Sequence, residues 1–316
     1  MTRALPRLRS FVLACVCGAS TVTYGQTQSA QPSAAPPLPV IRFCTSPAIF
    51  PQVNVRDAEI AMELWTSQMQ PILGFQAMLE LHVIDDMQTI ETELAAGHID
   101  VLALTVMNYL DMITRLPLRP EVVPQRGGEI LSRQLLLVHR EAGIDDVTQL
   151  AGRRVLVSTL DRGQTAHKWL DVLLLRQGYG PTSAEKVTLE LRNRPGHAVP
   201  PVLFGQADAS IVDEVTYELL CEMNPQLRRD LRIIAASPSL MTRVMCSRID
   251  MDPALRGIMF DTAMRMHTEP TGAQILALLQ TERPEPFREE FLDNVRALLE
   301  EHEQLHRAWV ARTSRP

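Results

Sequence analysis

Residues 97–104 read GHIDVLAL and residues 205–212 read GQADASIV, so the outline Gly-x-x-Asp followed by an apolar run occurs twice. In each copy an apolar segment leads into the glycine and a tyrosine follows the run, Tyr109 in the first copy and Tyr217 in the second. Glycine relieves the left-handed turn that ends a helix, and a continuous apolar run suits a buried parallel strand. The repeat therefore predicts two α/β lobes of one plan, with a cleft at the carboxyl ends of their strands.

The first 25 residues have the composition of a secretory signal. Three arginines precede a short apolar run from Phe11 to Gly18, and small and polar residues follow as far as Gly25. The run is far shorter than the roughly 20 residues that a membrane span needs. We therefore expect a signal peptide over residues 1–25 and export to the periplasm.

A linker is expected between the signal and the folded body. Residues 26–39 read QTQSAQPSAAPPLP, with four prolines and no apolar period, which predicts disorder. The folded body is expected to begin near Val40. The letters VLAC at residues 12–15 match a lipoprotein signal poorly, so a lipid anchor is not expected.

Composition and charge limit the class of protein. The 316 residues are 46% hydrophobic and 22% charged, as in an ordinary globular protein with room for two cores. Without the arginines of the signal, the net charge falls from −6 to about −9, which disfavours nucleic acid and anionic membranes as partners. For the remaining cysteines the sequence leaves two alternatives: a Cys221–Cys246 bridge with Cys44 free, or three buried thiols.

The hydrophobic pattern predicts strands that alternate with helices, and hence a mainly parallel sheet in each lobe. Strands are expected at residues 40–44, 79–84, 99–104, 121–124, 135–139, 154–159, 187–191, 209–212 and 231–235, and longer helices at 56–69, 87–96, 165–176, 199–204, 214–223, 252–267, 272–279 and 286–311. Beyond Pro238 the chain is expected to be helical and to return to the first lobe. The expected lobes are 40–135 with 238–316, and 136–237.

From Leu150 to Asp213 the sequence resembles periplasmic solute-binding proteins of ABC transporters, of the phosphonate, phosphite and phosphate type. The resemblance extends over nearly the whole mature chain and rests on the two Gly-x-x-Asp copies, LxGxxV at residues 150–155 and the pair Gly196-His197. It implies a two-lobed fold of the type II periplasmic-binding-protein class, joined by hinge crossovers. The implied function is non-enzymatic: the lobes close on a small anion and present it to a membrane permease.

The resemblance also indicates where an anion would bind. Members of the family hold phosphonate with a Ser-Thr-Ser-Gly run after a strand of the second lobe, and the matching positions here are Arg162-Gly163-Gln164-Thr165. Only Thr165 keeps a hydroxyl, and Thr159 belongs to the same loop. The start of a helix favours an anion through its free N–H groups and its dipole, and Arg162 could add a bidentate contact.

Other candidate contacts come from the remaining strand ends. Ser46 follows the first strand, and Tyr109 matches the family position in the first lobe. His197 lies at a strand-to-helix junction and could donate a hydrogen bond to an anionic oxygen. Asp213 and Glu214 could receive an amine group of the ligand, although Asp213 could equally serve only as a helix cap.

Two other functions stay open at this point. A periplasmic sensor would bind a similar ligand and present the closed form to a receptor or kinase. His302-Glu303-Gln304-Leu305-His306 fits the H-E-x-x-H pattern of zinc peptidases, but no third ligand follows it and an acidic terminal helix explains the same letters. The preferred hypothesis is a monomeric binding protein without metal or cofactor.

Overall fold

The computed structural model describes residues 38–49, 56, 60, 77–159 and 163–314. The predicted signal peptide, nearly all of the linker and most of the predicted helix at residues 56–69 lie outside these ranges, as does Arg162. None of the helices that the structure describes is both long and apolar enough to cross a membrane.

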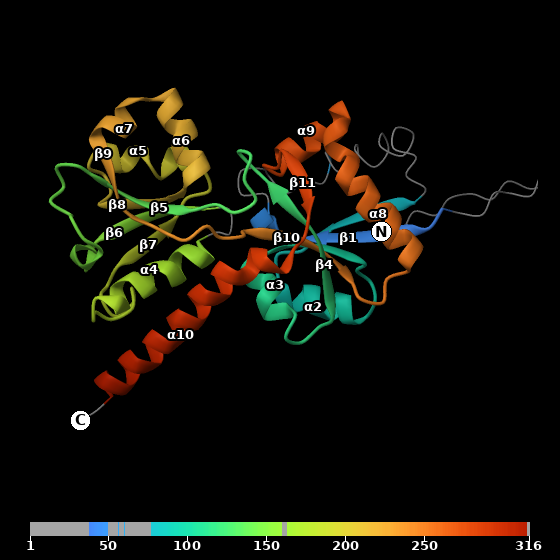
Figure 1. Ribbon diagram of the computed structural model, residues 1–316, viewed down its shortest axis with the longest axis horizontal. Helices are drawn as coiled ribbons and strands as arrows, with labels where there is room; N and C mark the ends of the chain where they lie inside the picture. Colours follow the sequence, from blue (N-terminus) through green and yellow to red (C-terminus); the bar gives the residue numbers. More distant parts are fainter. Residues whose placement is uncertain (1–37, 50–55, 57–59, 61–76, 160–162, 315–316) are drawn as a thin grey trace, which may run out of the picture. The chain divides into compact units, whose positions relative to one another are not determined.

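The first sheet has six strands in the order β11-β4-β10-β3-β1-β2 (Figure 1). Its strands are β1 (Val40–Thr45), β2 (Met78–Val83), β3 (Val101–Thr105), β4 (Leu118–Gln125), β10 (Arg243–Arg248) and β11 (Arg283–Pro286). Strand β1 pairs in parallel with β2 and β3, whereas β10 is antiparallel to β3 and β4, and β11 is antiparallel to β4. Two expectations were therefore wrong: the sheet is mixed rather than mainly parallel, and the chain beyond Pro238 supplies two strands besides helices.

The second sheet has five strands in the order β7-β6-β8-β5-β9. Its strands are β5 (Gln134–His139), β6 (Arg154–Ser158), β7 (Thr188–Leu191), β8 (Ala209–Asp213) and β9 (Leu231–Ala236). Strand β6 is parallel to β7 and β8, and β5 is antiparallel to β8 and β9. This sheet is mixed as well, because β5 enters from the first sheet in the opposite direction.

The two copies of the Gly-x-x-Asp pattern make the same backbone contacts in the two sheets. Asp100 exchanges two hydrogen bonds with the backbone of Arg42, through its N–H and its carboxylate, each 2.9 Å long. Asp208 does the same with the backbone of Arg154, at 3.1 and 2.9 Å. The backbone of Gly97 has φ +76° and that of Gly205 has φ +66°, both in the left-handed region that glycine adopts without strain. The repeat therefore ties the entry of one parallel strand to its neighbour, β3 to β1 and β8 to β6.

Helices cover both faces of the first sheet. The described α-helices are α2 (Met87–Ala95), α3 (Val106–Met112), α4 (Gln164–Arg176), α5 (Pro200–Leu203), α6 (Glu214–Met223), α7 (Gln226–Asp230), α8 (Pro253–Arg265), α9 (Pro270–Leu278) and α10 (Asp293–Thr313). Alternate residues of one strand point to opposite faces. Accordingly Leu102 packs in the cluster that contains α2 and α3, whereas Val101 packs with Met259 of α8.

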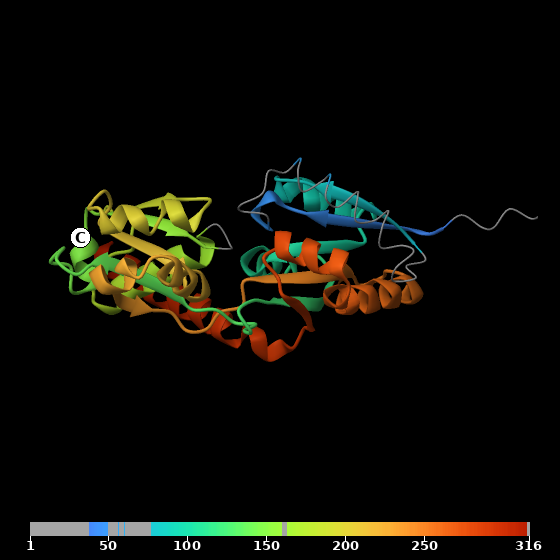
Figure 2. The same ribbon diagram turned by 90° about the horizontal axis from the view of Figure 1, so that it is seen from above.

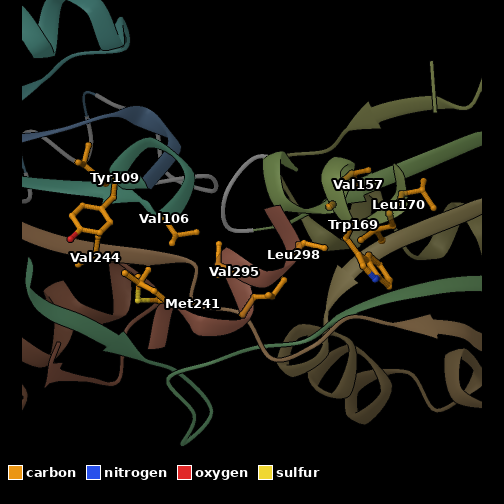
Figure 3. Close-up of a cluster of buried hydrophobic side chains, with 14 of the residues drawn as sticks. Val106, Tyr109, Val157, Trp169, Leu170, Met241, Val244, Val295 and Leu298 are labelled. Carbon is orange, nitrogen blue, oxygen red and sulfur yellow. The ribbon is translucent and has the colours of Figure 1, made fainter. Parts of the chain in front are cut away.

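The C-terminal helix departs from the expectation that it packs on the first lobe. Helix α10 packs along α4, beside the second sheet (Figure 1). Arg176 of α4 forms a bidentate pair with Glu301 of α10, with Nε–Oε1 and Nη2–Oε2 distances of 2.6 and 2.7 Å. The first turns of α10 enter the main hydrophobic cluster through Val295 and Leu298 (Figure 3).

Two connections link the sheets, residues 126–133 between β4 and β5 and residues 237–242 between β9 and β10 (Figure 2). They pair with each other, since the backbones of Ser132 and Leu240 exchange two hydrogen bonds of 3.0 Å. The paired connections are the structural counterpart of the expected hinge crossovers.

The three described cysteines are free and buried. Cys44 and Cys246 belong to the main hydrophobic cluster, and Cys221 belongs to a separate cluster under the second sheet. Of the two alternatives left by the sequence, the structure has the three buried thiols.

Candidate ligand-binding site

The end of β3 and the start of α4 meet at a polar junction. Thr105 is the last residue of β3, and its hydroxyl accepts a hydrogen bond from the Asn108 N–H at 3.2 Å, which caps α3. The same hydroxyl donates to Oε1 of Gln164, the first residue of α4, at 3.1 Å. Nε2 of Gln164 in turn donates to Oδ1 of Asn108 at 3.3 Å. The exposed side-chain amide of Gln164 therefore links the end of a strand in the first sheet to the start of α4, which packs beside the second sheet.

The start of α4 has the geometry that the sequence led us to expect. Gly163 precedes the helix with φ +80°, and its N–H donates to the Thr159 hydroxyl at 2.9 Å. A Cβ at Gly163 would lie 2.8 Å from Cδ2 of Leu191, so close packing as well as backbone conformation calls for glycine. Thr165 is buried in the first turn. Three of the four family-matched positions thus lie at the N-terminus of a 13-residue helix, and the fourth, Arg162, lies outside the described residues.

Ser46 lies at the corresponding end of β1. It is buried, and its carbonyl accepts a hydrogen bond of 3.0 Å from the Ile49 N–H in the short 3-10 helix Pro47–Ile49. The preceding Thr45 is paired with Ala103 of β3. Ser46 therefore follows a strand adjacent to β3, at the same carboxyl edge as Thr105.

Asp213 ends β8, and both of its carboxylate oxygens accept hydrogen bonds. Its Oδ1 accepts from Nη1 of Arg126 at 2.6 Å and from the Thr216 N–H at 3.0 Å, while its Oδ2 accepts from the Thr216 hydroxyl at 2.7 Å. Asp213 is thus the N-cap of α6 and the partner of an arginine from the connection between the sheets. The structure has the cap that the sequence suggested as one alternative, whereas the carboxylate that could have received a ligand amine is paired with Arg126.

Tyr109 and His197 lie elsewhere than the junction residues. The Tyr109 ring is only 4% exposed and packs in the main hydrophobic cluster near Met241 and Val244 (Figure 3), and burial raises the pKa of its hydroxyl to about 12. His197 is exposed at the end of a short 3-10 helix, Pro195–His197. In the part of the chain that the structure describes, the side-chain hydrogen bonds of Gln164 are to Thr105 and Asn108 and not to Tyr109 or His197, whose roles in binding stay predictions.

Sequence reasoning missed Arg243, which begins β10 opposite Thr105. Its guanidinium is buried and donates to the backbone carbonyls of Leu279, Gln280 and Ile49, at 2.7, 3.3 and 3.4 Å. Burial lowers the pKa of Arg243 to about 10, and the positive charge of Arg126 acts in the same direction. No described acidic side chain forms an ion pair with it. The sequence offered one signal, a lone arginine at the start of an apolar run.

Arg243 also borders a cavity of about 120 Å³ between the first sheet and helices α8 and α9. The walls are almost entirely apolar, with Thr45 and Thr281 as the other polar side chains among the described lining residues. The guanidinium is the single charge among those residues.

The two histidines of the H-E-x-x-H pattern in α10 take part in helix packing. Nε2 of His302 lies 3.2 Å from Oδ2 of Asp171 in α4, and the His306 ring stacks on that of His302 at a centroid distance of 5.8 Å. Glu303 faces solvent beside Arg307. Among the residues that the structure describes, no group of three metal-ligating side chains occurs.

Solved structures of similar fold include a component of a phosphonate transporter and proteins in complex with chloride ion and with methylphosphonate. A binding-protein component of an ABC phosphonate transporter from Pseudomonas aeruginosa is 16% identical, with a TM-score of 0.63 over 86% of this chain and 89% of that chain. XAC2383 from Xanthomonas citri, bound to chloride ion, is 17% identical with a TM-score of 0.62 over 85% and 99%. PhnD1 from Prochlorococcus marinus, in complex with methylphosphonate, is 11% identical with a TM-score of 0.59 over 84% and 98%.

These similarities confirm the predicted α/β fold of the type II periplasmic-binding-protein class, with mixed rather than mainly parallel sheets. A search of curated proteins finds no match. A family model described as "ABC transporter, phosphonate, periplasmic substrate-binding protein" matches residues 48–291, which is more than half of the chain. The chain therefore belongs to the family of periplasmic substrate-binding proteins of phosphonate ABC transporters.

Proposed function

We propose that the chain captures a small phosphonate-type anion at the junction of its two lobes and delivers it to the membrane permease of an ABC transporter. The observation that carries this proposal is the contact of Gln164 with Thr105 and Asn108, because it brings the N-terminus of α4 to the carboxyl edge of the first sheet. A helix N-terminus favours an anion through its free N–H groups and its dipole. The methylphosphonate complex of the Prochlorococcus marinus protein supports the choice of anion.

The proposed contacts come from both lobes. Gln164 and Thr165 would supply N–H groups and a hydroxyl from the start of α4, next to Gly163, with Thr159 and Arg162 in the preceding loop and Ser46 from the end of β1. Tyr109 and His197 are retained as second candidates that would move toward the ligand on closure. Closure is expected to be a hinge motion about the connections 126–133 and 237–242, in which contacts from both lobes favour the closed state.

The rest of the proposal concerns how the protein works. We infer that it binds without catalysing a reaction, acts as a monomer and reaches the periplasm through a signal in residues 1–25. The proposed lobes are residues 40–135 with 238–316, and 136–237. The strands of the two sheets support this division, since they follow it except for the first two residues of β5, whereas helix α10 packs along α4 of the second lobe.

Calorimetry with the purified protein tests the proposal. The panel is methylphosphonate, ethylphosphonate, phosphite, methanesulfonate and citrate, and we expect saturable binding of one phosphonate or phosphite per chain. Gln164→Ala should weaken that binding, whereas Gln226→Ala, at the start of α7 and outside the junction, should leave it unchanged. Absence of binding by every phosphonate and phosphite would overturn the proposal.

A further inference from the structure

The two acidic residues that follow one another at the end of β8 each have an arginine partner. Asp213 pairs with Arg126, and Glu214 pairs with Arg133, whose Nε donates to Oε2 at 2.8 Å. Both arginines belong to the connection 126–133 between β4 and β5. One crossover therefore supplies the cations for both carboxylates that could otherwise receive an amine of a ligand.

The Asp213 carboxylate has little capacity left for a ligand. It already accepts hydrogen bonds from Arg126 and from the N–H and hydroxyl of Thr216, and its side chain is only 6% exposed. Arg126 closes the arrangement, because its Nη2 donates to the Thr216 hydroxyl at 2.7 Å. A ligand ammonium would have to displace a guanidinium that is held at two points.

Positive charge exceeds negative charge around this pair. Arg243 interacts electrostatically with both Arg126 and Asp213, and it has no ion pair with a described residue. Its Nε is buried without a hydrogen-bond partner. Only Arg126 pairs with the Asp213 carboxylate, and Arg243 adds a second positive charge in the surroundings. An ammonium group at this place would therefore meet like charge, which is costly where little water is present.

We propose that the ligand is an anion that carries no ammonium group, and that Arg126 sets this preference by occupying Asp213. This inference rests on the proposed function and narrows its ligand class to alkyl- or otherwise amine-free anions. Arg126 follows β4 of the first sheet directly and reaches the end of β8 in the second, so the pair also lies across the two lobes.

Ethylphosphonate and 2-aminoethylphosphonate test the inference, because they share one anionic head and differ by an ammonium group. Calorimetry on the intact wild-type protein should give at least about tenfold tighter binding of ethylphosphonate, the scale expected when a polar site meets the wrong charge. Arg126→Met frees Asp213 and should reduce this ratio about tenfold or reverse it. Arg229→Met removes an exposed arginine paired with Asp230 and should leave the ratio unchanged.

Asp213→Asn keeps the test decisive if Arg126→Met does not fold. If Asp213 received a ligand amine, this variant would lose affinity for 2-aminoethylphosphonate alone, and the preference for ethylphosphonate would increase. Our inference predicts that the variant keeps the preference of the wild-type protein. The inference is overturned if the wild-type protein binds 2-aminoethylphosphonate at least as tightly as ethylphosphonate, or if Arg126→Met leaves the ratio unchanged. If neither probe binds, and no other phosphonate or phosphite binds either, the proposed function is overturned and this inference with it.

Discussion

Gln164 and Thr105 hydrogen-bond to each other across the two sheets, with the threonine hydroxyl 3.1 Å from Oε1 of the glutamine. Thr105 is the last residue of β3, and Gln164 is the first residue of α4. The contact thus joins a strand end to a helix start that the sequence keeps 59 residues apart. A ligand bound at the start of α4 would meet the first sheet at this point.

The energy of this contact can be measured with a double-mutant cycle of Gln164→Ala and Thr105→Val. We expect a coupling of about 0.5–1.5 kcal/mol in the free energy of unfolding, the usual net value of a hydrogen bond. Thr105→Val alone should cost about 1 kcal/mol more, because it also removes the cap of α3. As a control, Gln164→Ala combined with Thr92→Val should be additive, since Thr92 bonds only within α2. Additive effects for Gln164 with Thr105 would contradict the contact.

Gly163→Ala should destabilise the start of α4 more than a glycine replacement elsewhere. A left-handed backbone costs an L-residue about 1–2 kcal/mol, and Gly163 has φ +80°. The added methyl group would also overlap Leu191 and Val157, at 2.8 and 3.1 Å, and overpacking costs about 1–3 kcal/mol. Chemical denaturation compares it with Gly152→Ala, which has φ +70° and no atom within 4 Å. Equal losses for the two variants would contradict the close packing at Gly163.

The features that sequence could predict are those encoded by neighbouring residues. The Gly-x-x-Asp repeat fixes a helix end and a strand entry within a few residues, and the structure has Asp100 and Asp208 in identical backbone contacts. Strand β10 was missed because its sequence, RVMCSR, has charged ends and no alternation. Its place in the sheet depends on pairing with β3 and β4, far away in the chain.

The ion-pair partners of the charged side chains at the site were less predictable, because they come from distant parts of the chain. From its position at a strand end, Asp213 was predicted to receive a ligand amine or to serve only as a helix cap. Nothing near it in the sequence indicates that the guanidinium of Arg126, 87 residues away, occupies this carboxylate. Pairing across a hinge is decided by the tertiary arrangement, so the sequence suggests the carboxylate but not its partner.

The three described cysteines should resist alkylation in the native protein. Burial raises the pKa of the Cys44 thiol to about 12 and that of Cys246 well above its ordinary value, so the reactive thiolate is rare. Iodoacetamide followed by peptide mass spectrometry should find Cys44, Cys221 and Cys246 unmodified before denaturation and fully modified after it. A disulfide-linked peptide containing Cys221 and Cys246, or rapid labelling of the native protein, would contradict this prediction.

His302 should make the stability of the protein depend on pH. Burial between α10 and α4 lowers the pKa of His302 from its ordinary value of 6.5, although the hydrogen bond to Asp171 opposes the shift. Below pH 6.5 the unfolded chain therefore binds a proton that the folded chain does not, and acid favours unfolding. The contribution of His302 is complete above this pH and is lost as the pH falls toward the lowered pKa of the folded state.

Denaturant titrations of the wild-type protein and of His302→Gln, between about pH 7.5 and about pH 5, test this dependence, because histidine titrates in this range. Glutamine can donate a hydrogen bond to Asp171 without titrating, so the variant should lose less stability than the wild-type protein as the pH falls. His98→Gln provides the control, because His98 is exposed and pairs only with Glu93 near the surface. A wild-type protein and a His302→Gln variant with parallel pH profiles would show that the packing of α10 on α4 does not depend on neutral His302.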